Sequence, residues 1–114
     1  MRGLFIVVAF ACCAAVVIAD EPAKATASTL KGDMKRGEKL FVDRCSDCHD
    51  AFSEEERVGP GLQGISKGKI PDGRKATFEL ILDIINTGPA EMTSFKGLLT
   101  EQEKADIVMY VLTL

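Results

Sequence analysis

Five consecutive residues, Cys45-Ser46-Asp47-Cys48-His49, hold the groups with the most distinctive chemistry. Two thiols three positions apart can each add to a different vinyl group of a haem. A histidine directly after the second thiol is then held beneath the iron. The motif therefore predicts one covalent haem c, with Cys45 and Cys48 as its attachment points and His49 as an axial iron ligand.

Three other uses of a C-x-x-C motif fit the sequence less well. A thioredoxin-like redox pair follows a strand in a βαβ unit, and no such pattern is visible. A zinc site needs about four ligands, whereas the chain has one histidine and only two cysteines beyond position 13. A disulfide between Cys45 and Cys48 would close a ring too small to stabilise the fold much.

The second axial ligand cannot be a histidine, because His49 is the only one in the chain. Methionine, lysine, water or an open position remain. Met34 and Met109 follow the apolar periods of expected helices and are predicted to be core residues. Met92 stands in a polar loop and is predicted to ligate the iron, the alternative being a methionine that fills a packing gap.

Three helices are expected to position these groups. Asp33 is a candidate N-cap for the first, Thr77 opens the second, and residues 100–103 (TEQE) form a capping box that starts the third. Between the first two helices, residues 53–75 are rich in glycine and proline and predict a long loop, which in a small domain usually has a function. No convincing two-residue alternation typical of strands appears, so the predicted class is all-α.

From Asp33 to Leu114 the sequence resembles class I cytochromes c, especially short bacterial monohaem carriers. The resemblance implies a cytochrome c-like fold, with three main helices packed around the haem. Gly37 and Phe41 match the first-helix positions where that family's last helix crosses closely, and Tyr110 matches the aromatic partner.

Two loops carry the rest of the resemblance. Residues 59–62 (GPGL) resemble the family loop in which a proline carbonyl accepts the axial histidine N–H, which implies that role for Pro60. Asn86-Thr87-Gly88 and Met92-x-x-Phe95 resemble the methionine loop. The family often has proline after this methionine, whereas Thr93 stands here.

The N-terminus has the layout of an export signal: Arg2, an uncharged apolar run from Leu4 to Ile18, and small residues before Asp20. The predicted organisation is a signal peptide over 1–19, a flexible lead-in over 20–32 and a cytochrome c domain over 33–114, with a periplasmic location. An uncleaved membrane anchor and a lipid on Cys12 are the alternatives.

The predicted mature chain is acidic, since the loss of Arg2 from 14 basic residues leaves 13 against 17 acidic ones, a net charge of −4. This excess disfavours nucleic-acid binding, which needs a basic footprint. With both axial positions filled by side chains, no site remains for a substrate. We therefore expect a one-electron carrier between redox proteins, not an enzyme. The alternatives are a haem-based ligand sensor, a peroxidase-like enzyme, or a cytochrome subunit of an oxidoreductase complex.

Overall fold

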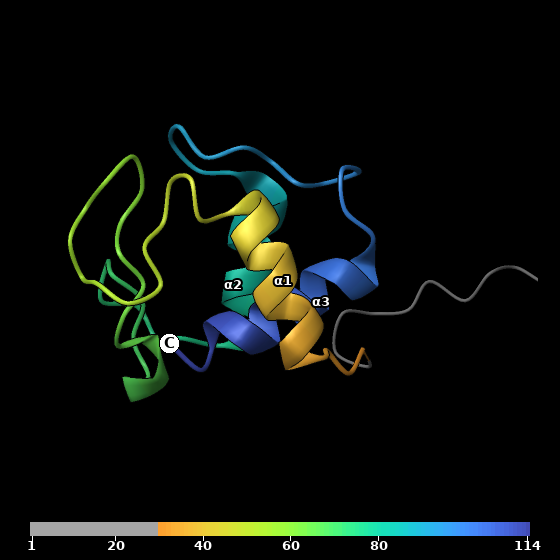
Figure 1. Cartoon of the computed structure of the whole chain (residues 1–114), viewed down its shortest axis with the longest axis horizontal. Coiled ribbons are helices and arrows are strands. Elements are labelled where there is room, and N and C mark those ends of the chain that lie inside the picture. The colour runs from red at the N-terminus through yellow and green to blue at the C-terminus, as the bar shows by residue number, and fades with distance from the viewer. Residues whose placement is uncertain (1–29) are drawn as a thin grey trace, which may run out of the picture.

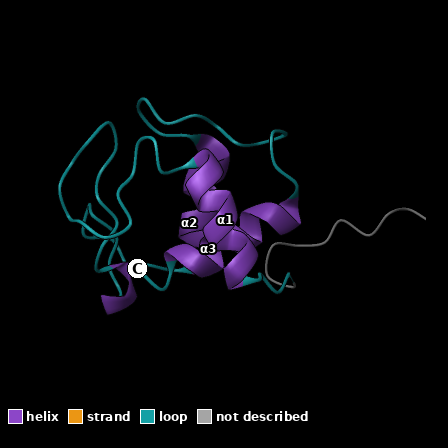
Figure 2. Ribbon diagram, in the orientation of Figure 1, coloured by secondary structure: helices purple, strands orange, loops and turns teal. Residues whose placement is uncertain are grey.

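The computed structural model describes residues 30–114. The predicted signal peptide (1–19) and most of the predicted lead-in (20–32) lie outside the described residues. Three helices, α1 (Met34–Arg44), α2 (Phe78–Thr87) and α3 (Glu101–Val111), cross near the centre of the domain, with long loops on either side (Figure 1). Within residues 30–114 there is no strand (Figure 2), and the predicted all-α class is confirmed.

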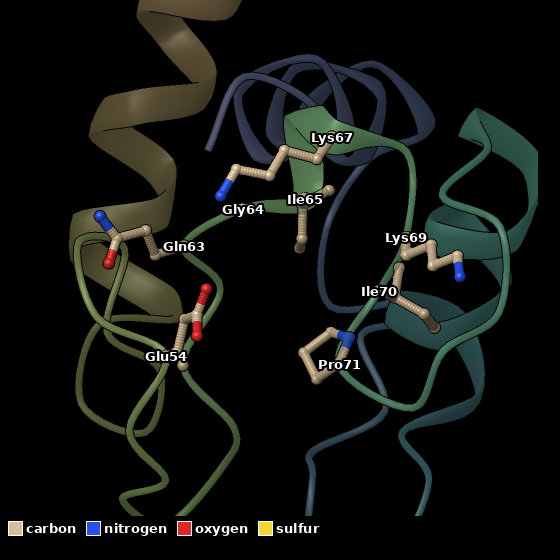
Figure 3. Close-up of a pocket in the computed structure, with 9 residues that line it drawn as sticks. Glu54, Gln63, Gly64, Ile65, Lys67, Lys69, Ile70 and Pro71 are labelled. Atoms are coloured by element: carbon tan, nitrogen blue, oxygen red, sulfur yellow. The ribbon is translucent and has the colours of Figure 1, made fainter.

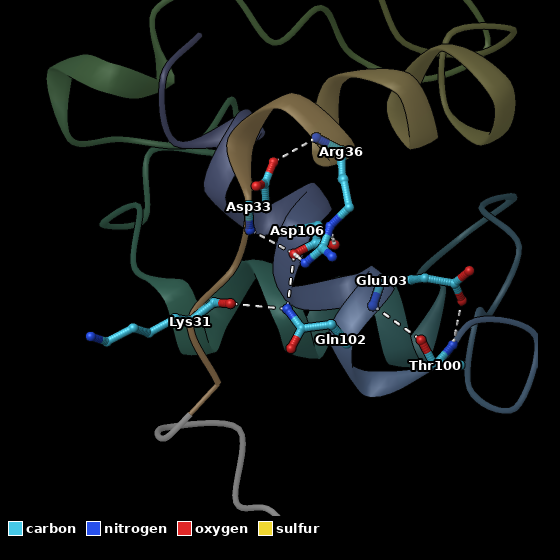
Figure 4. A network of polar contacts seen from close by, with 7 residues as sticks. All are labelled: Lys31, Asp33, Arg36, Thr100, Gln102, Glu103 and Asp106. Atoms are coloured by element: carbon cyan, nitrogen blue, oxygen red, sulfur yellow. Dashed lines mark hydrogen bonds and ion pairs between the residues drawn. The ribbon is translucent and has the colours of Figure 1, made fainter.

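Each helix begins where its capping residue predicts. The side chains of Asp33, Thr77 and Thr100 accept hydrogen bonds from backbone N–H groups three residues further on. Such caps satisfy backbone donors that have no partner within the helix. Thr100 and Glu103 form the complete reciprocal capping box (Figure 4).

Helices α1 and α3 cross at Gly37. A Cβ atom added at this position would collide with the backbone carbonyl of Asp106, so only glycine permits so close an approach. One turn later, the ring of Phe41 lies 5.4 Å from that of Tyr110, at an angle of 59°. This tilted geometry is favourable for aromatic pairs. The contacts predicted for Gly37, Phe41 and Tyr110 are therefore present.

A buried carboxylate connects the start of α1 to α3. Asp106 is 2% exposed, and its oxygens accept hydrogen bonds from the Asp33 backbone N–H at 2.6 Å, Gln102 Nε2 at 2.9 Å and the Arg36 guanidinium (Figure 4). Burial alone would raise the pKa of Asp106, but these donors outweigh it and lower the pKa. The charge is thus stabilised inside the fold by partners from two helices.

The remaining core is formed by apolar side chains from all three helices and the long loop. Helix α2 contributes Ile81, Leu82 and Ile85, and the loop contributes Ile65 and Ile70. In the segment predicted as a loop, Ile65–Lys67 forms a short 3-10 helix, η2. None of the helices described within residues 30–114 has the length and apolar character required to cross a membrane.

Candidate functional site

The cysteine–histidine motif lies in the turn that ends α1. The backbone N–H groups of Cys45 and Ser46 both donate to the carbonyl of Phe41, at 2.8 and 3.0 Å, and that of His49 donates to the carbonyl of Cys45 at 2.9 Å. These bonds wind the chain tightly after the last helical turn. The arrangement gathers both thiols and the imidazole at one end of α1.

His49 is oriented by the segment that follows the motif. Its Nδ1 lies 2.8 Å from the carbonyl oxygen of Pro60. A carbonyl can only accept, so Nδ1 must carry the proton, and in the neutral ring Nε2 then presents a free lone pair. This is the tautomer that an imidazole needs to bind a metal ion through Nε2.

Gly59 lets the backbone lie directly against this imidazole. A Cβ atom at position 59 would stand 2.5 Å from Cε1, 2.8 Å from Nδ1 and 3.0 Å from Nε2 of His49. The Gly59 N–H also donates to the carbonyl of Cys48 at 2.9 Å. Arg57 also connects the loop to the motif, because its Nη1 donates a hydrogen bond to the Ser46 carbonyl at 3.2 Å. The loop thus closes back on the motif and holds the ring.

The two thiols are free and half-buried. Burial, and secondly the nearby Cys48, raises the pKa of Cys45 to about 11. A thiol of this kind stays protonated at neutral pH and is poorly suited to disulfide exchange, which proceeds through the thiolate. No group of three or more His, Cys, Asp or Glu side chains in residues 30–114 could hold a metal ion. Neither the redox-pair nor the zinc interpretation gains support.

Met92 lies in a loop that is anchored to the end of α2. Gly88 ends the helix in the left-handed conformation, with φ of 59°. The Ser94 hydroxyl donates to the Asn86 carbonyl at 2.5 Å, and the Phe95 N–H donates to the Ile85 carbonyl at 2.9 Å. The Met92 side chain is half-buried and packs against the hydrophobic core. An apolar thioether is therefore turned inward from a polar loop.

The other two candidate methionines correct a prediction. Met34 and Met109 were expected in the core, but they are 48% and 37% exposed. Met34 is the first residue of α1, in which only Gly37 and Phe41 are buried. Met109 is the one exposed position between Lys104 and Val111 of α3, which are otherwise all buried. Met109 instead lies over Gly32, where an added Cβ would collide with its Cγ.

The long loop borders a pocket of about 320 Å³. Glu54, Gln63 and Lys67 lie on one side of it and Ile70 and Pro71 on the other (Figure 3). The lining includes Gly61, the residue after Pro60, so the segment that contacts His49 continues directly into the pocket wall.

Sequence reasoning missed three contributors to the site and its frame. Gly59 was noticed as part of a motif, but its contact with the His49 ring was not predicted. Lys104 and Asp106 are almost completely buried, although charged residues in a helix usually face solvent. No local pattern predicts their burial, because part of each partner set is distant in the chain: Asn86 for Lys104, and Asp33 and Arg36 for Asp106.

These residues fit a covalently attached haem. Two thiols and an imidazole with a free Nε2 come from one turn, and an inward-facing thioether comes from a separate loop. A haem of the c type is attached through two cysteines, and a histidine and a methionine are the iron ligands in cytochromes c.

Residues 32–111 match the family model for subunit III of cbb3-type cytochrome c oxidase. Cytochrome c type-1 of Ascaris suum is 30% identical over 98 residues, covering 71% of this chain and 88% of that protein. Cytochrome c6 of Rippkaea orientalis is 29% identical over 87 residues, covering 76% of each chain.

The fold is similar to the crystal structure of cytochrome c6 from the diatom Phaeodactylum tricornutum. The TM-score is 0.55 at 26% identity, and the match covers 72% of this chain and 93% of that one. The chain thus belongs to the cytochrome c family represented by the cbb3 subunit III model and is a monohaem, electron-carrying c-type cytochrome with covalently bound haem c.

Proposed function

We propose that Cys45 and Cys48 bind the haem through thioether bonds, that His49 and Met92 are the axial ligands, and that Pro60 orients His49. The observation that carries the proposal is the 2.8 Å contact between His49 Nδ1 and the Pro60 carbonyl. This contact leaves the lone pair of Nε2 free to bind the iron, and it makes the imidazole more basic. When bound, the haem supplies an iron that changes oxidation state by one electron.

The two axial side chains serve a carrier better than an enzyme. His49 is held by Gly59 and Pro60, and Met92 by a loop tied to α2, so neither needs to move when the charge of the iron changes. A thioether ligand and an apolar surrounding both favour the ferrous state and raise the potential. With both axial positions occupied by the protein, no position is left for a substrate.

The cellular setting is proposed from the sequence pattern. Export through residues 1–19 would place the domain in the periplasm, an oxidising compartment. The partners would be redox proteins that exchange one electron with the domain. Attachment to a membrane would follow only if the N-terminal segment were retained or lipidated.

Replacing Met92 tests the ligand set. Met92→Ala should lower the reduction potential, change the visible spectrum and let the ferrous protein bind carbon monoxide, because a small side chain cannot reach the iron. Met34→Leu and Met109→Leu are the matched controls and should do none of these, since both side chains are substantially exposed.

The same measurements separate the carrier from its alternatives. If the unaltered ferrous protein binds carbon monoxide readily, the sixth position is open, and a sensor or a peroxidase-like enzyme becomes the better interpretation. If Met92→Ala keeps the parent spectrum and potential, another group holds that position. Co-purification from the native host distinguishes a free carrier from a subunit of a larger complex.

A further inference from the structure

The methionine loop runs from the end of α2 to the start of α3, and one buried lysine joins these two ends. Lys104 is 1% exposed. Its Nζ donates to Asn86 Oδ1 at 2.6 Å and pairs with Glu101. Asn86 comes just before the loop and Glu101 just after it. Lys104 therefore closes the base of the loop that carries Met92.

Asn86, which accepts the hydrogen bond from Lys104, is also bonded to a residue within the loop. The backbone carbonyl of Asn86 accepts the Ser94 hydroxyl bond at 2.5 Å. Within the loop, the Met92 N–H donates to the Pro89 carbonyl at 3.1 Å. Hydrogen bonds thus extend from Lys104 through Asn86 to Ser94, two residues from the proposed ligand.

Burying an ammonium group removes it from water at a high free-energy cost, which is offset only by well-placed partners. An apolar side chain would fill the same space in α3 without this cost. The lysine is explained if the hydrogen bonds that its ammonium group donates to Asn86 and Glu101 hold separate segments together. Closing a loop also reduces the number of conformations it can adopt, which favours a ligand held in one position.

We propose that Lys104 is a positioning residue for the sixth ligand: by joining Asn86 to Glu101, it holds the methionine loop closed and keeps Met92 on the iron. The proposal rests on the ligand assignment made above for Met92. Lys104 itself does not act on the iron. Its hydrogen bonds determine the fraction of time for which the methionine loop is open.

The test uses holoprotein variants and measures the rate at which the ferrous protein binds carbon monoxide, together with the reduction potential. Lys104→Met gives an unbranched side chain of similar volume, one heavy atom shorter, and removes the donors. We expect carbon monoxide to bind about tenfold faster or more, the factor that corresponds to one lost hydrogen bond to a charged group. The potential should fall as the loop opens.

Asp106→Asn is the matched control. Asp106 lies on the same helix and is equally buried, but its partners are Asp33, Arg36 and Gln102, not the loop. This variant should lose stability while its carbon monoxide rate stays within about twofold of the parent. Asn86→Asp keeps an acceptor for Lys104 and should also behave like the parent.

Equal acceleration in Lys104→Met and Asp106→Asn would overturn the proposal, because the effect would then be general destabilisation. No acceleration in Lys104→Met would overturn it as well. If Lys104→Met does not accumulate with haem, Asn86→Leu takes its place, because it removes the acceptor while the pair of Lys104 with Glu101 remains. Acceleration equal to that of Asp106→Asn, or no acceleration, would then overturn the proposal.

Met92→Ala, measured in the same series, separates this proposal from the ligand assignment. If Met92→Ala fails to open the site to carbon monoxide, the assignment is wrong and the role of Lys104 falls with it. If Met92→Ala opens the site but Lys104→Met does not, only the role of Lys104 is wrong.

Discussion

Replacing Gly59 by alanine should displace His49, the proposed axial ligand, while leaving its imidazole chemically unchanged. The new Cβ would stand 2.5 Å from Cε1 of His49, whereas non-bonded carbon atoms settle at about 3.5 Å or more. The ring or the backbone must therefore move by about 1 Å. The bond between His49 Nδ1 and the Pro60 carbonyl is 2.8 Å long, and a displacement of this size would stretch it beyond hydrogen-bond length.

The expected loss of stability has two parts. Overpacking of a tight site typically costs about 1–3 kcal/mol, and one lost hydrogen bond costs about 1 kcal/mol. We expect the free energy of unfolding of Gly59→Ala to fall by about 2–4 kcal/mol in denaturant titrations of the holoprotein. The φ angle at position 59 lies outside the left-handed region, so the loss would not come from backbone strain.

The reduction potential should change as well. A His49 that no longer donates to Pro60 is a weaker electron donor to the iron, which favours the ferrous state. For one electron, a factor of ten in the equilibrium corresponds to about 59 mV. We expect a rise of about 20–60 mV in a redox titration.

Gly73→Ala is the control, because Gly73 has φ of 89° and no atom within 4 Å of an added Cβ. It should cost about 1 kcal/mol through backbone strain and leave the potential unchanged. If Gly59→Ala retains the parent potential and loses no more stability than Gly73→Ala, the inferred contact between the Gly59 backbone and the His49 ring does not orient the ligand.

Three further predictions concern export, folding and acid stability. Protein from the native host should have the mass of residues 20–114 plus one haem; retention of residues 1–19, or a lipid on Cys12, would contradict cleavage at the predicted site. Replacing Cys45 and Cys48 by alanine should leave a chain without cooperative unfolding, since the haem supplies much of the apolar contact in a domain this small; a sharply melting haem-free protein would show the opposite. The pKa of Asp106 is lowered by folding, so its contribution to stability is present above its unfolded pKa of about 4 and is lost as the pH falls through the folded pKa. The stability difference between the parent and Asp106→Asn, followed by urea unfolding against pH, should therefore shrink in acid, and a difference independent of pH would refute this.

Local chemistry explains why the sequence alone predicted so much of the fold. A helix cap joins residues three positions apart, so Asp33, Thr77 and Thr100 marked their helix starts before any tertiary contact was known. The haem motif is local for the same reason, since its two thiols and imidazole lie within one turn. The resemblance to class I cytochromes c added the pairing of α1 with α3.

Contacts between distant residues were decided only by the tertiary structure. The period of apolar residues shows that a helix has an apolar side, but the segments that pack against the helix determine which of its positions are buried. Met34 and Met109 fit the period and are exposed, whereas Lys104 and Asp106 break the expected polarity and are buried. Their burial is stable because Asn86 of α2 accepts a hydrogen bond from Lys104, and because Asp33 at the start of α1 and Arg36 within it donate to Asp106.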